Sequence, residues 1–255
     1  MNELLLLSGN DIPFPEAQVT IHQPRIYEIA YIGEEAFYTG CGFLDFSKKI
    51  LDDKDKVRLS NYTDFNILMS IMISKDSSVK HNIENALLVL SLLFPLYEIG
   101  VRADAIVLKQ NDKEYLITEK NFDAFKKILQ SIFSLGNKDN ESDYNPSDSM
   151  AKRIAEKFKK RQEQLKKLAN EKSDSKKFDI LSRYVSILAV GAEKDINSLM
   201  NYTVYQLYNE FQRFQLKVQW DAYLQARMAG AQDLDEVDNW MIDLDKVGQN
   251  KTNKK

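Results

Sequence analysis

Apolar residues recur at helical spacing over most of the chain, and short β-prone runs interrupt this pattern only in the first half. The helical spacing predicts amphipathic helices at residues 63–72, 79–97 and 121–135, after two shorter ones between Pro24 and Phe46. Thr63 is the expected N-cap of the first of these, and Ser77 or Ser78 that of the second. A short strand is expected at 17–21. The runs at 105–109 and 114–118 predict a β-hairpin, because the four residues between them are polar and turn-prone.

The second half of the chain is predicted to be helical throughout. Residues 136–149 are polar, contain Gly and Pro and lack apolar periodicity, which is typical of a linker. A basic helix with a thin apolar stripe is expected at 150–172. Helices are then predicted at 178–190 and 203–229, with a last short one from Asp233 to Leu244. The 203–229 helix carries aromatic side chains on several faces, so neighbouring helices or a partner must cover it.

These patterns predict a mainly α fold of the α+β type in four parts. Residues 1–135 are expected to form a mainly helical N-terminal domain with a small β-hairpin or sheet. Residues 136–177 form a polar linker and basic connector helix, 178–245 a helical C-terminal domain, and 246–255 a disordered basic tail.

Composition places the chain among globular proteins, with 44% hydrophobic and 29% charged residues over 255 positions. Nine glycines are few for a protein built on glycine-rich nucleotide loops. One cysteine excludes a disulfide scaffold or a cysteine-based zinc site, and two histidines leave little material for histidine-centred catalysis. The charge is unevenly distributed. Residues 1–145 carry a net −7, residues 146–177 a net +6 and residues 178–245 a net −6.

No targeting or membrane segment is predicted. The opening Met1–Ser8 lacks the basic start of a secretory signal. The most apolar stretch, 86–97, is shorter than the roughly 20 residues of a membrane span and contains Pro95, so a buried core helix is favoured. We therefore expect a soluble, intracellular protein.

Catalytic and metal-binding motifs are not recognised. The chain has no phosphate-binding Gly-x-x-x-x-Gly-Lys loop and no Gly-x-Ser-x-Gly elbow. Cys41 is interpreted as buried or incidental, since a catalytic thiol would need His22 or His81 as its base. The acidic cluster at 233–238 fits the first turns of a helix better than a metal site. The sequence thus predicts a protein that is not an enzyme and uses no cofactor or metal.

The basic stretch at 152–177 is the strongest charged feature. Lys157, Lys160 and Arg161 are candidate contacts for an acidic protein partner. A solvated connector helix is the alternative interpretation. Nucleic acid binding is a third but disfavoured one, because Phe158 is the sole aromatic residue for base stacking in the helix.

The aromatic helix at 203–229 is either an internal core helix or a surface for a partner or a second copy. Tyr, Trp, Arg and Met are enriched at the centres of protein interfaces. Five candidate contacts of these types lie on the helix: Tyr205, Arg213, Trp220, Arg227 and Met228.

Three groups of motifs resemble a known class of proteins. The first group comprises Ile21-His22-Gln23-Pro24, Glu28-Ile29 and Gly33-Glu34-Glu35-Ala36-Phe37. The second is Asn145-Pro146-Ser147-Asp148 before the basic helix. The third comprises Tyr205–Phe211, Trp220-Asp221, Ala229-Gly230-Ala231 and Glu236–Met241. This layout is similar to tail-assembly proteins of tailed bacteriophages, of the tail-assembly chaperone or baseplate-hub assembly type.

The resemblance implies a non-enzymatic role in virion morphogenesis, in the host cell cytoplasm or in the virion. Such proteins hold tail components, often the long helical tape-measure protein, until tube subunits polymerise. Phage tail proteins are therefore the expected partners: tape measure, tube or baseplate hub. Self-association is also considered. A structural baseplate or neck component and a nucleic-acid-binding accessory protein are the alternatives.

Overall fold

The computed structural model describes residues 2–48, 57–74, 76–133, 179–231, 237–244 and 247. The fold is mainly helical with two small antiparallel sheets, which confirms the predicted fold class. The chain divides into two compact units. Unit 1 contains residues 1–135 and 184–211, and unit 2 contains residues 136–183 and 212–255. Residues 184–211 thus belong with the N-terminal part, whereas the sequence analysis placed them in a separate C-terminal domain.

Unit 1 starts with a short helix and a two-stranded sheet. Gly9, with φ of 67°, ends α1 (Glu3–Ser8) in the left-handed region that glycine tolerates. Strands β1 (Ile12–Phe14) and β2 (Val19–Ile21) pair antiparallel, joined by the 3-10 turn η1 (Pro15–Ala17). The predicted strand at 17–21 is therefore confirmed over its last three residues.

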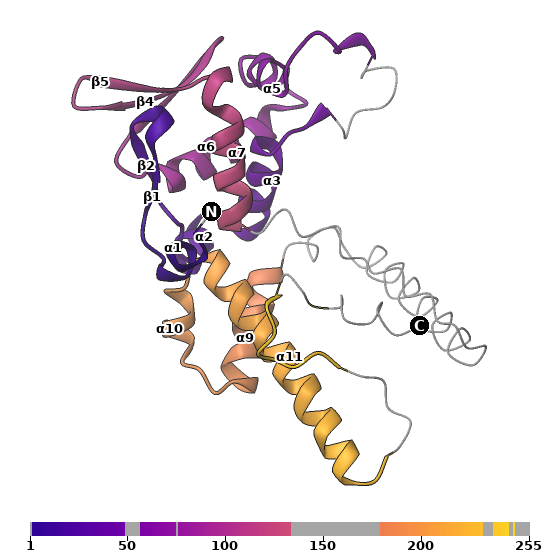
Figure 1. Ribbon diagram of the computed structural model, residues 1–255. Helices are drawn as coiled ribbons and strands as arrows, with labels where there is room; N and C mark the ends of the chain where they lie inside the picture. The colour runs from indigo at the N-terminus through magenta and orange to yellow at the C-terminus, as the bar shows by residue number, and fades with distance from the viewer. Residues whose placement is uncertain are drawn as a thin grey trace. The chain divides into compact units, whose positions relative to one another are not determined.

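A group of helices follows in unit 1, and their order is visible in Figure 1. Their bounds are α2 (Ile26–Ile32), α3 (Glu34–Leu44), α5 (Asp64–Met72), α6 (Lys80–Leu93) and α7 (Glu119–Phe133). Thr63 caps α5 as predicted, accepting a hydrogen bond from the backbone N–H of Asn66. The predicted serine cap of α6 is wrong. The N-cap residue is Val79, whose apolar side chain cannot accept a hydrogen bond.

The second sheet has the strand order β3-β4-β5 (Glu98–Arg102, Ala105–Gln110, Lys113–Ile117). Strands β4 and β5 form the predicted hairpin (Figure 1). Asn111 and Asp112 at its turn both have positive φ, at 47° and 62°, as a tight hairpin turn requires. Strand β3 was not predicted, because the apolar run before it reads as one long helix. Pro95 is incompatible with a continuing helix, and α6 ends at Leu93.

Phenylalanine side chains form the centre of unit 1. Phe14, Phe94, Phe122 and Phe125 are at most 1% exposed, and the ring centroid of Phe125 lies 6.2 Å from that of each of the other three. They come from β1, the end of α6 and α7, so the small sheet and the helices share one core. Burial of such large side chains is the main source of stability for an element as short as β1.

Residues 184–211 are held in unit 1 by backbone and aromatic contacts. They comprise most of α9 (Ile180–Gly191), α10 (Ile196–Met200) and the first turns of α11 (Val204–Met228). The backbone N–H of Ile26 donates to the carbonyl of Tyr202 at 2.9 Å, and Arg25 forms a β-bridge with Thr203. The first turn of α2 therefore obtains its hydrogen-bond partner from a segment over 170 residues away.

Helix α11 confirms the long helix predicted at 203–229. It continues past Phe211 into unit 2. The short helix predicted from Asp233 to Leu244 is not found over residues 237–244, which form turns and no α-helix. Residues 233–236 of that prediction lie outside the described part of the chain.

Candidate functional site

The predicted contact residues divide into those that the structure describes and those that it does not. Lys157, Lys160 and Arg161 lie outside the described residues, so the basic docking helix stays a prediction. Tyr205, Arg213, Trp220, Arg227 and Met228 all lie on α11. Tyr205 is in unit 1 and the other four are in unit 2.

Tyr205 contacts its own unit. Its hydroxyl donates to Glu3 Oε1 at 3.3 Å, and the next residue, Gln206, donates from Nε2 to the carbonyl of Leu7 at 2.7 Å. These two contacts fasten α1 to the start of α11. Tyr205 therefore has a structural role in joining the N-terminal helix to the returning segment.

Arg213 holds the segment 237–244 against α11. Its Nη1 donates to the carbonyl of Trp240 at 3.0 Å and also to the carbonyl of Ile242. A guanidinium group offers five N–H donors in a planar fork, which suits the binding of two adjacent carbonyls. Arg213 thus fixes a loop of unit 2, and Trp240 remains 39% exposed there.

Trp220, Tyr223 and Arg227 form a stack along one side of α11. The ring centroids of Trp220 and Tyr223 lie 5.8 Å apart, and the Arg227 guanidinium lies 5.8 Å from the Tyr223 ring centroid. Their spacing of three and four residues places them on one face of a helix. Met228, which is 80% exposed, lies beside the end of this stack in sequence. The arrangement is a preformed apolar and cationic surface of the kind that protein interfaces use.

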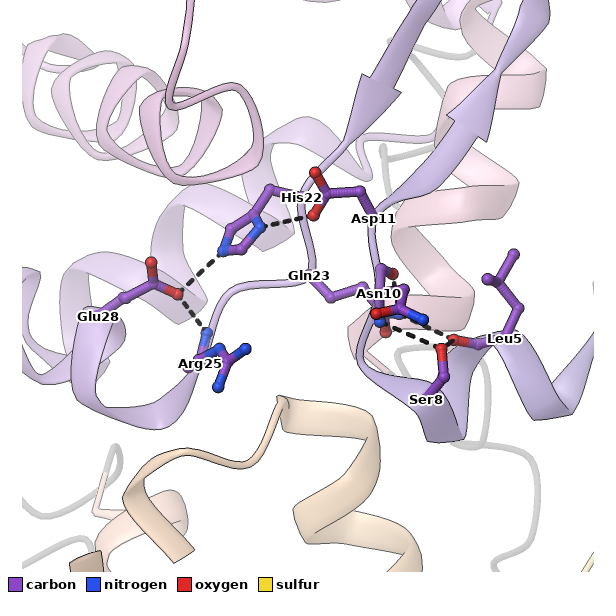
Figure 2. A network of polar contacts seen from close by, with 8 residues as sticks. All are labelled: Leu5, Ser8, Asn10, Asp11, His22, Gln23, Arg25 and Glu28. Atoms are coloured by element: carbon purple, nitrogen blue, oxygen red, sulfur yellow. Dashed lines mark hydrogen bonds and ion pairs between the residues drawn. The ribbon is translucent and has the colours of Figure 1, made fainter. Parts of the chain in front are cut away.

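A polar network in unit 1 was not anticipated as a functional feature (Figure 2). His22 Nδ1 lies 2.8 Å from Asp11 Oδ1, and His22 Nε2 lies 3.1 Å from Glu28 Oε2. Glu28 Oε2 also accepts from the backbone N–H of Arg25 at 2.6 Å, which satisfies one donor at the start of α2. The ring of His22 therefore connects Asp11, directly before β1, to the first turn of α2.

Gln23 lies beside this network and is fully buried. Its Nε2 donates to the carbonyls of Leu5 and Asn10, at 3.1 and 2.6 Å (Figure 2). The two contacts hold the loop after α1 in place. Both His22 and Gln23 belong to the motif Ile21-His22-Gln23-Pro24, so that motif was the sequence signal for this network. The contacts of His22 and of Gln23 Nε2 are a structural use of polar residues. Gln23 Oε1 differs, because it is buried without a hydrogen-bond partner among the described residues.

The other candidate for chemistry, Cys41, is fully buried on α3. Burial raises the pKa of its thiol well above the ordinary value, and the nearby Asp45 carboxylate raises it further. A thiol in that environment stays protonated and unreactive. The buried interpretation of Cys41 is therefore confirmed. Within the described ranges, no cluster of three or more His, Cys, Asp or Glu side chains is arranged to hold a metal ion.

Two partly buried tyrosines, one on α3 and one on α11, meet in unit 1. The hydroxyl oxygens of Tyr38 and Tyr208 are 3.1 Å apart. Burial is the largest cause that raises the pKa of each phenol. The Tyr184 ring packs edge-on against Tyr208 and stacks on Phe211 at 3.8 Å between centroids. This aromatic group joins α3, α9 and α11.

One comparison with known proteins gives a match. Residues 169–245 match the family described as YomV second domain, which is phage-derived. The chain is similar to phage proteins over this range. No curated protein and no solved structure matches. The matched range covers less than half of the chain, and it includes α9, α10, α11 and every predicted contact on α11.

The match indicates a phage protein, in agreement with the phage origin that the sequence motifs imply. The match does not address a role in tail assembly. The described helices include none that is long and apolar enough to span a membrane. This agrees with the interpretation of 86–97 as core, since Ala86, Val89, Leu90 and Leu93 of α6 are fully buried.

Proposed function

We propose that this chain is a non-enzymatic tail morphogenesis protein of a phage, which binds helical tail components in the host cell cytoplasm during assembly. The match of residues 169–245 to a phage-derived family supports the phage context. The resemblance of the sequence motifs to tail-assembly proteins supports the choice of tail components as partners. Tape-measure, tube and baseplate-hub proteins are the partners to test.

The observation that carries the proposal is the stack of Trp220, Tyr223 and Arg227 on α11. It lies inside the range that matches the phage family, and its members are held in place by contacts with one another. An amphipathic helix of a partner can lie along such a face, because apolar side chains at helical spacing fit a helical groove. Preorganised aromatic and arginine side chains lose little conformational entropy on binding, which is why they dominate interface energetics.

Co-expression with the tape-measure, tube and hub proteins of the same phage tests the proposal. Affinity capture of one of these proteins is expected, and Trp220→Ala and Arg227→Ala should each weaken it by about 1–2 kcal/mol or more. Val218→Ala is the matched control, because Val218 is 50% exposed on the same helix but points away from the stack. Capture of none of the three proteins, or equal losses for all variants, would contradict the proposal.

Mass spectrometry of purified virions beside infected-cell lysate separates the two phage roles. A protein that is abundant in lysate and absent from particles supports an assembly factor that leaves before maturation. A fixed stoichiometry in particles would favour a structural baseplate or neck component instead.

The basic stretch provides a second proposed contact, with an acidic segment of the partner. Joint charge reversal of Lys157, Lys160 and Arg161 should weaken capture at low salt, because exposed charge pairs act over a longer range there. Unchanged capture at low salt would remove this part of the proposal. Binding of nucleic acid that falls steeply with added salt would favour the nucleic-acid alternative for this stretch.

A further inference from the structure

Helix α11 carries a second exposed face that differs from the aromatic stack. Phe214, Lys217, Asp221 and Leu224 follow one another at spacings of three, four and three residues. This spacing is the a and d pattern of a heptad repeat, so the four side chains lie along one narrow stripe of the helix. All four belong to unit 2.

The stripe is accessible to solvent. Leu224 is 40% exposed and Phe214 is partly exposed. The side chains of Lys217 and Asp221 are 55% and 45% exposed. Leu216 is buried instead, and it lies four residues before Trp220, on the face of the aromatic stack. An apolar pair that flanks two charges on an exposed heptad stripe can pack against a helix with matching positions.

Two copies of the stripe are complementary in charge when their helices run in opposite directions. Lys217 Nζ lies 2.6 Å from Asp221 Oδ2 within the helix, one turn apart. When a second copy of the helix runs in the opposite direction about a two-fold axis at Gln219, each lysine faces an aspartate. The same operation brings each Phe214 opposite a Leu224. A parallel pair in register would instead place lysine beside lysine and aspartate beside aspartate, which is unfavourable.

We infer that this face of α11 is a self-association surface, on which two copies of the chain pair antiparallel through Phe214, Lys217, Asp221 and Leu224. The pairing is isologous, since the same patch serves both subunits. The inference concerns a different face from the stack of Trp220, Tyr223 and Arg227 and does not depend on the proposed role in tail assembly.

The pairing is reversible and concentration-dependent. About three turns of helix provide two apolar layers around two charged layers. Polar residues at a and d positions fix the orientation of a helix pair at a cost in stability. The charges therefore set the direction of the pair and the apolar residues provide its attraction. Like charges at the same two layers should abolish the association.

Sedimentation equilibrium over a concentration series of the full chain tests the inference. The wild type is expected to dimerise, and Lys217→Asp and Asp221→Lys should each weaken dimerisation by about tenfold or more. The decisive sample is an equimolar mixture of these two variants. The mixture should recover the dimer, because an all-acidic stripe then meets an all-basic one although neither helix has regained its internal ion pair.

Three further variants control for effects on the helix itself. Lys80 and Glu84 form a comparable exposed ion pair on α6 in unit 1, with Nζ and Oε1 3.7 Å apart. Lys80→Asp and Glu84→Lys should leave dimerisation unchanged. The double variant K217D/D221K keeps both the internal pair and the two-fold complementarity, so it should dimerise as the wild type does.

Three results would overturn the inference. A wild type that is monomeric at every concentration removes the surface. Dimerisation of Lys217→Asp and Asp221→Lys as strong as that of the wild type excludes the antiparallel charge pairing. In a parallel pair, each of the three proteins would place like charges opposite one another, so the two variants would associate no more weakly than the wild type. A mixture that stays monomeric shows that the variants act within the helix and not between two copies.

Discussion

The hydroxyl of Tyr38 on α3 lies 3.1 Å from the hydroxyl of Tyr208 on α11, across 170 positions of sequence. The two hydroxyls form a hydrogen bond with each other, surrounded by aromatic rings. A buried hydroxyl without a partner costs more than the hydrogen bond contributes when both are present. This pair is therefore a sensitive reporter of whether residues 184–211 are seated in unit 1.

Removing one hydroxyl of this pair should destabilise the protein. We expect Tyr38→Phe or Tyr208→Phe to lower the free energy of unfolding by about 1–2 kcal/mol, because the remaining hydroxyl is left without a partner. The double variant should lose less than the sum of the two single losses. Urea unfolding followed by tyrosine and tryptophan fluorescence measures the cycle, and additive losses would show that the two hydroxyls do not interact.

The same pair predicts a loss of stability at alkaline pH. Burial raises the pKa of both phenols above the ordinary value of 10.0. The unfolded chain then releases these protons at lower pH than the folded one, so stability is fully present below pH 10 and falls as pH rises above it. Unfolding curves at pH 8 to 11 should show this fall. The Y38F/Y208F double variant should show a smaller fall, and an equal fall would attribute the effect to other groups.

The packing of α3 on α6 depends on Gly40. A Cβ at position 40 would lie 2.4 Å from the carbonyl oxygen of Asn85, which is too close for any side chain. We expect Gly40→Ala to destabilise the protein by more than about 2 kcal/mol, since backbone atoms must move apart. Gly42→Ala on the same helix is the matched control, because its Cβ would meet no atom within 4 Å. That variant should be neutral or stabilised by up to about 1 kcal/mol in thermal or urea unfolding.

Arg213 should determine the order of the segment 237–244. We expect Arg213→Ala to release this segment, because the carbonyls of Trp240 and Ile242 lose their donor. Faster hydrogen exchange at residues 240–244 and a shift in Trp240 fluorescence would report the release. Arg227→Ala is the control, since Arg227 contacts the ring of Tyr223 on the same helix. Unchanged exchange in Arg213→Ala would show that other contacts hold the segment.

The sequence predicts elements well where the signal is local. Helix α11 has 25 residues without Gly or Pro, and the Thr63 cap precedes α5 with a matching apolar period. The hairpin of β4 and β5 follows from two β-prone runs around a polar turn. In each case the residues that determine the element lie within or next to it.

Features that depend on distant contacts were missed. Strand β3 forms because its residues pair with β4, and no pattern within Glu98–Arg102 shows that pairing. The contacts of His22 with Asp11 and Glu28 depend on the path of the chain between β2 and α2. The placement of 184–211 in unit 1 depends on contacts such as Ile26 with Tyr202, which span most of the chain.

The candidate site also combines features that the local sequence predicts with features that depend on distant contacts. Aromatic and arginine residues on α11 were identified by type, but their type does not reveal which of them contact their own chain. Arg213 binds two carbonyls and Tyr205 contacts Glu3, whereas Trp220 and Arg227 remain in a solvent-accessible stack. The heptad stripe of Phe214 and Leu224 was not recognised, since charged residues occupy its two central positions.

The return of residues 184–211 to unit 1 affects how the protein is made. Translation proceeds from the N-terminus, so residues 1–135 leave the ribosome before the residues that complete their unit exist. At about 5–20 residues per second in synthesis, the nascent chain waits several seconds for Tyr202 and Tyr208 to emerge. During that interval the first turn of α2 lacks the carbonyl that accepts from Ile26, and Tyr38 lacks its phenolic partner. Unit 1 is therefore completed only after residues 136–183, which belong to unit 2, have been synthesised.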